Sequence, residues 1–370
     1  MTNHAKIKNL VRKTGGIRRL ILILVAVALG VILILDILSG EKLFDPLGYL
    51  YVIISTLIIL YGLYPLYVNR RLIGYYWERF RRNHLAVAGL GFVLLLILLA
   101  IFGPAFTADP TAVNFEEKNM PPKGFTIEES AYNIATQQLV TRTTTGTSQH
   151  PLGTDNKGRD LLAMIISGTR VSLQVGLFAT GIAIVIGTLI GITSAYLGGR
   201  IDNILMRFTD VMMTFPFFLL LVFIVFIFGP NLAFIVLVIG LTGWTGTARL
   251  IRSETLSLRT REFIMAAKAL GAGTDRIILT HLVPNVISLI VVIATLSIPG
   301  IILAEAALSF IGLGDPSVTS WGMVLRAGQQ NMETAWWVAV APGAMLFLTV
   351  LAFNFMGDGL RDAFDPRSTA

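Results

Sequence analysis

The chain has 370 residues, of which 54% are hydrophobic and only 14% are charged, whereas a soluble domain is about one quarter charged. It contains no cysteine, which excludes disulfide bonds and thiolate chemistry. The net charge of +7 is compatible with nucleic-acid binding, but in so apolar a chain an excess of Lys and Arg is more typical of cytoplasmic loops between membrane spans, so we expect no nucleic-acid partner.

Apolar residues occur in long blocks, and the blocks 85–106, 173–196 and 335–356 contain no charged residue. Each is long enough for the hydrocarbon core of a bilayer, which about 20 helical residues cross. Because lipid offers no hydrogen bonds to the backbone, such blocks must be helices. The sequence therefore predicts an all-α polytopic membrane protein with eight spans, at 20–38, 47–68, 85–106, 173–196, 211–228, 232–248, 286–308 and 335–356.

The distribution of charge sets the expected orientation. Most of the 29 Lys and Arg residues fall in the N-terminal tail, in the loops after the second, fourth and sixth predicted spans, and in the C-terminal tail. The positive-inside rule places these segments in the cytoplasm. We therefore expect a multi-pass plasma-membrane protein with both termini cytoplasmic.

The long loop between the third and fourth predicted spans then lies outside. Its middle part, 114–149, is polar, rich in Thr and without periodicity, which predicts exposed irregular structure. The following residues, 150–160, are denser in turn formers. Gly153 and Gly158 allow backbone angles that other residues resist, and Asp155 and Asp160 can cap a turn or the start of a helix.

The cytoplasmic loop 253–285 differs from the other loops because it has helical periodicity. Four of its residues fall on one face of such a helix: Phe263, Ala266, Ala267 and Leu270. Gly271 suits a helix C-terminal cap with positive φ, and together with Gly273 it should end this helix. Thr274 or Asp275 suits the N-cap of a second helix, and Pro284 should restart the chain toward the next span.

This predicted helix–turn–helix has two interpretations from its residues alone. A helix that presents small alanines on one face allows the close approach of a partner, so the pair could pass the motion of a soluble protein into the membrane. Alternatively, the pair is interfacial and packs only on its own helix bundle.

The loop resembles the coupling loop of permease subunits of ATP-binding-cassette importers, whose pattern is Glu-Ala-Ala, three residues, Gly, nine residues, then Ile, any residue, Leu-Pro. Four residues of this chain lie at that spacing: Ala266, Ala267, Gly271 and Pro284. Met265 replaces the Glu, His281 replaces the Ile and Val283 replaces the Leu. The changes at 265 and 281 resemble the peptide-permease branch of the family.

Three further stretches are similar to the same branch. They are His-Pro-Leu-Gly-Thr-Asp at 150–155 with Gly-Arg-Asp at 158–160, Leu-Ser-Phe-Ile-Gly-Leu-Gly at 308–314 with Ser-Trp-Gly at 320–322, and the stretch 351–367. Together the motifs resemble the C-type permease of dipeptide and oligopeptide importers over about residues 75–368. The resemblance implies a type I importer permease fold with six core transmembrane helices, and it leaves the first two spans as an added hairpin.

The expected organisation has five parts. They are a basic cytoplasmic tail (1–19), an extra transmembrane hairpin (20–68), a first core span with the long outer loop (69–172), a core permease domain (173–360) that contains the coupling loop 253–285, and a cytoplasmic tail (361–370). The sequence gives no role to the extra hairpin.

In this family an importer combines two homologous membrane subunits, two ATPase subunits and an extracytoplasmic binding protein. The resemblance implies that this chain is one membrane subunit in a prokaryotic inner membrane, forms half of the translocation path for di- or oligopeptides, and docks its coupling loop on an ATPase subunit. ATP and Mg would be bound by the ATPases, because this chain has no Gly-x4-Gly-Lys-Ser/Thr phosphate loop. We therefore expect no enzyme activity and no cofactor in the chain itself.

Other functions are weaker alternatives. The same class of importer can carry a non-peptide solute such as a nickel chelate, because the binding protein largely decides the cargo. A secondary transporter usually places coupling charges at the membrane midplane, whereas these span interiors are almost free of them. A membrane enzyme would need clustered catalytic residues. The four histidines are scattered without the spacing of metal ligands, so we expect no metal site.

The sequence thus gives two sets of candidate residues. The candidate coupling residues are Glu262, Phe263, Ala266, Ala267, Leu270, Gly271, His281 and Pro284. The candidate residues of the translocation path or its gate are Thr214, Thr245, Thr295, Ser297 and Glu305. The hydroxyls could instead bond their own helix backbone. Glu305, near the outer end of the seventh span, could be a gate, a buried pairing residue or a solvated interfacial residue.

Overall fold

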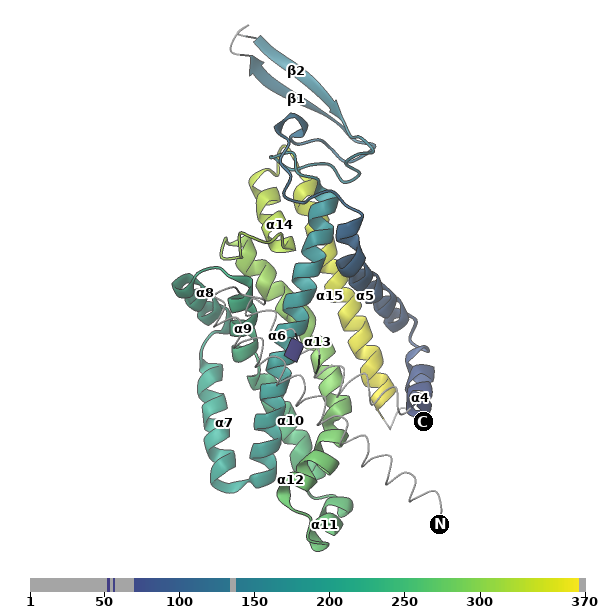
Figure 1. The fold of residues 1–370 in the computed structure, drawn as a ribbon, viewed down its shortest axis with the longest axis vertical. Helices are drawn as coiled ribbons and strands as arrows, with labels where there is room; N and C mark the ends of the chain where they lie inside the picture. Colours follow the sequence, from purple (N-terminus) through teal and green to yellow (C-terminus); the bar gives the residue numbers. More distant parts are fainter. Residues whose placement is uncertain (1–51, 54–55, 57–69, 134–137, 366–370) are drawn as a thin grey trace, which may run out of the picture. The chain divides into compact units, whose positions relative to one another are not determined.

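The computed structural model describes residues 52–53, 56, 70–133 and 138–365. The predicted tail 1–19 and span 20–38 lie outside the described residues, as does all but three positions of the span 47–68. The chain divides into two compact units, 1–78 and 79–370, and helix α4 (Arg70–Phe80) crosses their boundary. The candidate residues named above all lie in the second unit, which consists mainly of long helices (Figure 1).

Five helical segments of the second unit are long and apolar enough to cross a membrane. In chain order they are α5 (His84–Phe102) with the 3-10 turn η2 (Gly103–Ala105), α6 (Leu161–Leu197), α9 (Leu232–Thr242) with α10 (Thr245–Leu258), α12 (Thr274–Ile277) through α13 (Val283–Phe310), and α15 (Trp337–Phe364). Each contains all or nearly all of one predicted span, which confirms a helical membrane protein. The helices extend beyond most of the predicted ends, because a helix that leaves the bilayer loses its apolar signal without losing its backbone hydrogen bonds.

The predicted span 211–228 is divided between two helices, α7 (Gly199–Thr214) and α8 (Phe217–Phe228), whose axes differ by 78°. The break lies at Phe215, which has extended angles of φ −77° and ψ 128° directly before Pro216. A residue that precedes proline avoids the helical region, and proline itself lacks the N–H that would continue the helix. The prediction of one span at 211–228 is therefore corrected to a bent pair, which counts as a sixth crossing if both helices belong to one span.

Helix α6 lies at the centre of the second unit, where it packs against α5, α9, α10 and α13 (Figure 1). Gly187 and Gly191 face α10. A Cβ at 187 would lie 2.7 Å from the Cβ of Thr247, and a Cβ at 191 would lie 2.9 Å from the Cβ of Ile251. The small-residue pair of this span thus permits the close packing of the two helices.

The N-terminal half of α6 shares a hydrophobic core with α5, α13, α15 and the short helix α14 (Trp321–Gln330). This core includes Leu96, Met164, Ile302 and Trp321, all of which are buried. Ser320 caps the start of α14, and the Trp321 indole donates a 3.0 Å hydrogen bond to the carbonyl of Ile165. The bond satisfies the only polar group of a fully buried side chain.

The outer loop contains regular structure that the sequence did not indicate. A 3-10 turn η3 (Phe115–Glu117) precedes two antiparallel strands, β1 (Thr126–Asn133) and β2 (Gln138–Thr145), with Thr126 opposite Thr145 and Asn133 opposite Gln138. The hairpin extends beyond the ends of the long helices (Figure 1). The prediction of irregular structure over 114–149 was wrong because Thr, Val and Tyr favour strands, while the polar composition hides the alternation that marks a half-buried strand.

Candidate functional site

The predicted coupling loop forms α11 (Glu262–Ala269), a sharp turn, and then α12. The turn closes with two hydrogen bonds, from Gly271 N–H to the Lys268 carbonyl (2.9 Å) and from Ala272 N–H to the Ala267 carbonyl (3.0 Å). These are the two bonds of a Schellman motif, in which the residue after the helix adopts positive φ. Gly271 has a φ of 77°, as predicted for a C-terminal cap.

The second helix of the loop departs from the prediction. Its N-cap is Gly273, without a side-chain hydrogen bond, whereas the sequence had suggested Thr274 or Asp275. It also does not stop before the membrane, because α12 continues through the π-helical turn η4 (Ile278–Leu282) into α13. Pro284 is the second residue of α13, directly after this π-helical turn, so it does not restart the chain as predicted but lies within a continuous helix.

The inner side of the loop packs on the helix bundle. Ile264, Ile277 and Leu282 are fully buried in one cluster with Ile251 of α10, and Ala267 packs against its edge. None of Ile264, Ile277 and Leu282 was among the predicted site residues. The prediction considered only the helix face that carries the alanines, and these three residues lie elsewhere. The interpretation that the loop packs on its own bundle therefore holds for this side.

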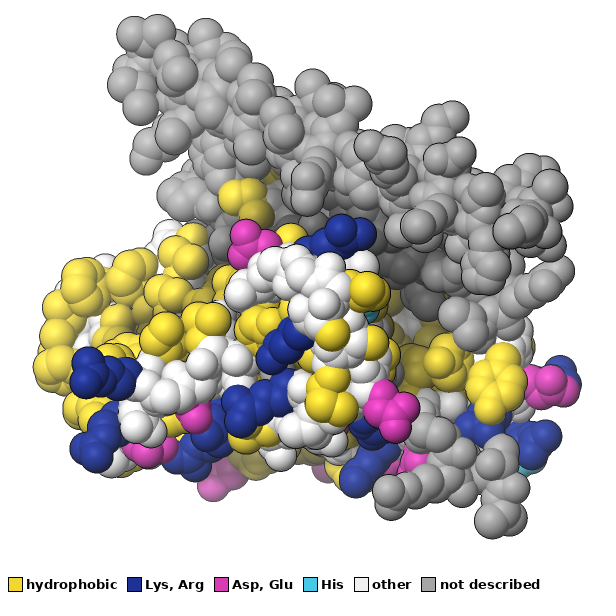
Figure 2. Space-filling model, turned by 90° about the horizontal axis from the view of Figure 1, so that it is seen from below, with side chains coloured by type: hydrophobic (Ala, Val, Ile, Leu, Met, Phe, Trp, Pro, Cys, Tyr) yellow, Lys and Arg dark blue, Asp and Glu magenta, His cyan; other side chains and the backbone are white. Residues whose placement is uncertain are grey.

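The outer side of α11 is free of the bundle. Phe263, Met265 and Leu270 are 41%, 54% and 88% exposed, and Ala266 is exposed beside them. Seen from this end of the molecule, hydrophobic side chains lie interspersed with Lys and Arg side chains (Figure 2). An apolar helix face held rigidly by buried anchors from behind is suited to a protein partner.

Basic side chains fasten the loop to the end of α6. Arg259 donates a 2.7 Å hydrogen bond to the carbonyl of Ala195, where the negative end of the helix dipole favours a cation. The Lys268 ammonium lies 5.0 Å from the centre of the Tyr196 ring. His281 is partly buried, with its ring 6.3 Å from that of Phe263, while Glu262 begins α11 and is exposed. The positions of α11 and the end of α6 are therefore linked directly.

The predicted path residues do not form one group. A cavity of about 340 Å³ lies among α6, α8, α9, α10 and α13, and its lining residues include Thr180, Thr247 and Ser297. Of the predicted path residues, Ser297 lines this cavity, while Thr214 and Thr295 donate to carbonyls of their own helices, at 2.7 and 2.8 Å. Thr245, the first residue of α10, is not among the lining residues. Thr180 and Thr247 were missed because helical Ser and Thr carry no signal for the direction in which they point.

Glu305 is a buried residue of α13, with 1% of its surface exposed. The hydroxyl of Ser309 donates a 2.6 Å hydrogen bond to Oε1, while Oε2 has no hydrogen-bond partner among the described residues. The interpretation as a solvated interfacial residue was therefore wrong. The start of α14 covers this part of α13, since Gly322 sits directly against Ala306 and Ser309, and hydropathy alone could not reveal that cover.

The outer turn 150–160 is ordered by the residues that the sequence singled out. Gly153 and Gly158 have φ values of 83° and 72°. Asp160 caps α6 by accepting a hydrogen bond from Ala163 N–H (2.9 Å), and Asp155 accepts from two backbone N–H groups of its own turn. The predicted capping roles of both aspartates are confirmed.

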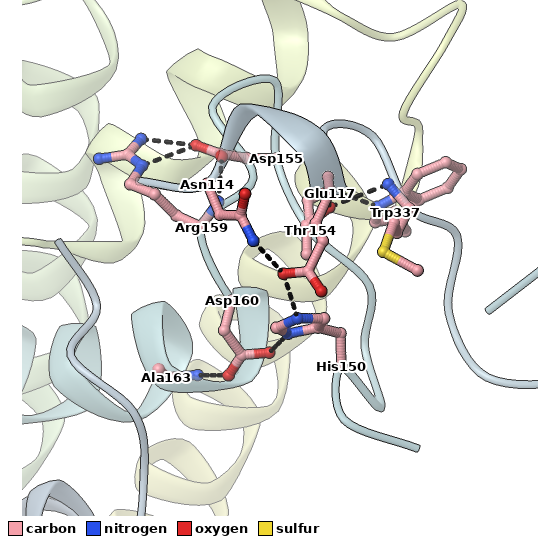
Figure 3. A network of polar contacts seen from close by, with 10 residues as sticks. Asn114, Glu117, His150, Thr154, Asp155, Arg159, Asp160, Ala163 and Trp337 are labelled. Carbon is pink, nitrogen blue, oxygen red and sulfur yellow. Dashed lines mark hydrogen bonds and ion pairs between the residues drawn. The ribbon is translucent and has the colours of Figure 1, made fainter. Parts of the chain in front are cut away.

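His150 has a defined place that the sequence did not predict. Its Nδ1 lies 2.9 Å from Oδ1 of Asp160, and its Nε2 lies 3.2 Å from Oε2 of Glu117 (Figure 3). Glu117 is distant in the sequence, so no local spacing could have indicated the cluster. Among the described residues no group of His, Asp and Glu has an arrangement that could hold a metal ion.

Comparison with known proteins gives consistent matches over the same region. The family model described as the binding-protein-dependent transport system inner membrane component matches residues 183–370, and a model of the N-terminal TM domain of oligopeptide transport permease C matches residues 72–122.

Individual relatives extend the match to more than three quarters of the chain. The oligopeptide transport system permease protein OppC of Haemophilus influenzae is 39% identical over 291 residues, which cover 78% of this chain and 87% of that protein. The dipeptide transport system permease protein DppC of Bacillus subtilis is 36% identical over 295 residues, covering 79% and 84%. The glutathione transport system permease protein GsiD of Pectobacterium atrosepticum is 37% identical over 293 residues, covering 79% and 90%.

Proposed function

Because this chain belongs to the family of binding-protein-dependent transport system inner membrane components, and within it to the oligopeptide and dipeptide permeases, we propose that it forms half of a translocation path for di- or oligopeptides. Its fold in this proposal is that of a type I importer permease, with the six spans of residues 69–360 as the core and the hairpin 20–68 as a peripheral addition. The family match over both the spans and the coupling loop is the observation that carries the proposal.

The proposed partners follow from the surfaces of the chain. A second, homologous permease subunit completes the path, and an ATPase subunit receives the exposed side of α11 and Gly271. A binding protein delivers the cargo to the outer surface. ATP and Mg are bound by the ATPases in this proposal, since the sequence has no phosphate loop, and the chain itself is non-catalytic.

The proposed orientation places α11 and both termini in the cytoplasm of a prokaryotic cell and the β1–β2 hairpin outside. Two observations support it. Helices α10 and α11, which contain Arg249, Arg252 and Lys268, lie toward one end of the helices, and the hairpin lies at the opposite end (Figure 1). The separation agrees with the positive-inside rule.

The proposed path runs through the cavity beside Ser297. Thr180 and Thr247 also line this cavity, among residues that are otherwise largely apolar. Glu305 is proposed as a buried gate residue rather than a lining residue, because its side chain does not reach solvent. Thr214, Thr245 and Thr295 remain secondary candidates.

The cargo is tested with the assembled importer. The complex of this chain with its second permease, its ATPases and its binding protein is reconstituted in proteoliposomes, and ATPase activity is measured with the binding protein empty, loaded with peptide, or offered a nickel chelate. The proposal expects stimulation by peptide-loaded binding protein and uptake of the same peptide. Stimulation only by the chelate would assign the importer a different cargo, and ATPase activity of the chain alone would contradict its non-catalytic role.

A further inference from the structure

The cluster around His150 has a geometry that depends on a proton. Ionised carboxylates only accept hydrogen bonds, and the two ring nitrogens of His150 each face one, from Asp160 and Glu117 (Figure 3). Both bonds are therefore made only when both nitrogens carry hydrogen, which is the charged imidazolium. A neutral ring would turn a lone pair toward one of the carboxylates.

Both carboxylates are held in place independently of His150. The second oxygen of Asp160 accepts from Ala163 N–H (2.9 Å) at the start of α6, where the helix dipole favours a negative charge. Glu117 accepts from the Asn114 side-chain amide (2.8 Å). When the ring loses its charge, these anions remain opposite it.

The other charged groups near the cluster are already paired or face solvent. Asp155, in the turn beside His150, forms a buried ion pair with Arg159 (2.7 Å), and the contact from α15 is the neutral indole of Trp337. The remaining charged side chains of the segments 114–120 and 150–160 are exposed, and they are Glu116, Lys118 and Lys157. Glu117 and Asp160 are therefore the groups that set the charge preference of the ring.

The cluster joins two segments to the outer ends of two helices. Segment 114–120 pairs with the turn through Met120 N–H to Thr154 Oγ1 (2.9 Å) and Thr154 N–H to the Met120 carbonyl (2.9 Å). The Trp337 indole at the start of α15 donates to the Thr154 carbonyl (3.0 Å), and Asp160 belongs to the start of α6. Among these contacts, the interaction of Glu117 with His150 and of His150 with Asp160 is the only one between charged groups that connects segment 114–120 to α6.

We propose that His150 is a positioning residue which, in its protonated form, ties Glu117 of segment 114–120 to Asp160 at the start of α6, so that this segment is held more tightly while the ring is charged. The consequence for transport rests on the proposed function, because it assumes that the binding protein docks on the outer side. The fastening itself does not depend on that function.

The direction of the pH dependence follows from the surroundings of the ring. Burial alone lowers the pKa of His150, but its hydrogen bonds with Asp160 and Glu117 and the charges of these groups outweigh burial, so the pKa lies above its ordinary value of 6.5. A raised pKa in the folded state means that the added stability is complete below pH 6.5 and is lost as the pH rises through the folded-state pKa.

The test compares the complete complex with two variants, Glu117→Gln and His84→Gln, from about pH 6 to about pH 9. Hydrogen exchange of segments 114–120 and 150–160 is followed by mass spectrometry, with exchange times scaled for the intrinsic rate at each pH. The ATPase rate with loaded binding protein, divided by the rate without it, is measured in parallel.

The variants are chosen for their hydrogen bonding. An amide at position 117 can accept a hydrogen bond from the charged ring and donate one to the neutral ring, so Glu117→Gln removes the requirement for a second proton on His150. His84, an exposed residue at the start of α5, is the matched control.

We expect wild type and His84→Gln to lose protection in both segments as the pH rises, with exchange about tenfold faster at the alkaline end, as for the loss of one charge-assisted hydrogen bond. Glu117→Gln should hold its protection nearly constant, and the ATPase ratio should fall with pH only where protection falls. Equal pH profiles for Glu117→Gln and wild type, or constant protection in wild type, would overturn the proposal. A constant ATPase ratio despite loss of protection would overturn its consequence for transport. A complex that shows this exchange behaviour but no stimulation at any pH would contradict the proposed function and leave the fastening established.

Discussion

Gly271 and Gly273 stand two residues apart in the turn after α11, and their backbone conformations differ. Gly271 has a φ of 77°, whereas Gly273 has a φ of −67°, an angle that any residue adopts. A Cβ on either residue would meet open space, so the two positions differ in backbone strain and not in room. Only Gly271 needs to be glycine for conformational reasons.

Replacing Gly271 by Arg should break coupling without preventing membrane insertion. The substitution strains the turn by about 1 kcal/mol or more and moves the exposed side of α11. The membrane spans do not depend on the contact between α11 and the proposed ATPase. We expect weaker co-purification of the ATPase and a sharp loss of transport at matched expression. Gly273→Arg adds the same side chain without the strain, so equal behaviour of the two variants would refute the conformational argument.

Ile264 shows the same loop from its buried side. The side chain is fully buried on the face of α11 that packs against the helix bundle. In comparable cores, truncation of such a side chain to Ala lowers the free energy of unfolding by about 2–5 kcal/mol. We expect Ile264→Ala to loosen α11 and to make the bonds around 262–270 more sensitive to protease in the isolated membrane fraction. Met265→Ala, at a position that is 54% exposed, should leave the cleavage rate near that of wild type. If both variants resist protease equally, α11 is not held by this anchor.

At the scale of helices and strands, sequence predicted what depends on local chemistry. The Schellman turn at Gly271, the cap at Asp160 and the positive φ at Gly153 follow from residues within a few positions. Ile264 was missed because its burial depends on α10, which is remote from any spacing within α11. The sequence left three interpretations of Glu305 open, and only the cover by α14 excludes a solvated side chain. Whether such residues are buried depends on packing against distant parts of the chain and not on local propensity.

The seam between α6 and α10 gives an element-scale prediction. Gly191 sits against Ile251 so closely that a larger side chain must displace a helix, at a cost of about 1–3 kcal/mol. We expect Gly191→Leu to lower the thermal unfolding temperature of the detergent-purified chain and its yield in the membrane. Gly246→Leu, on α10 at a position open to space, is the control. Equal unfolding temperatures for the two variants would mean that α6 and α10 can move apart at this contact without loss of stability.

In the second unit, apolar and polar side chains occupy different positions along the long helices. Apolar helices occupy the middle, α11 lies at one end, where Lys and Arg side chains are exposed among hydrophobic ones (Figure 2), and the hairpin lies at the other end (Figure 1). The His150 cluster lies at the start of α6, on the side of the hairpin. This division agrees with a chain threaded through a bilayer, in which polar networks gather where water is available.

Topology can be tested directly because the chain has no native cysteine. A membrane-impermeant thiol reagent applied to intact spheroplasts should label Thr143→Cys, in β2, and should label Ala269→Cys, in α11, only after the membrane is opened. Both side chains are exposed, so accessibility within the fold does not separate them. Labelling of Ala269→Cys in intact spheroplasts would reverse the proposed orientation.

Helix α6 has one further consequence. Its 37 residues run without a break from the cap at Asp160 to the carbonyls that receive Arg259, a length of about 55 Å at 1.5 Å per residue. A stiff rod of this length acts as a lever. If it pivots at the glycine seam with α10, which lies about three quarters of the way along the helix, a tilt of about 5° displaces the N-terminal end by roughly 4 Å and the C-terminal end by roughly 1 Å in the opposite direction. Displacements of this order are typical of helix movements in allosteric transitions. In such a motion the turn 150–160 and the end of α6 at Ala195 move together, so a displacement of one is transmitted to the other.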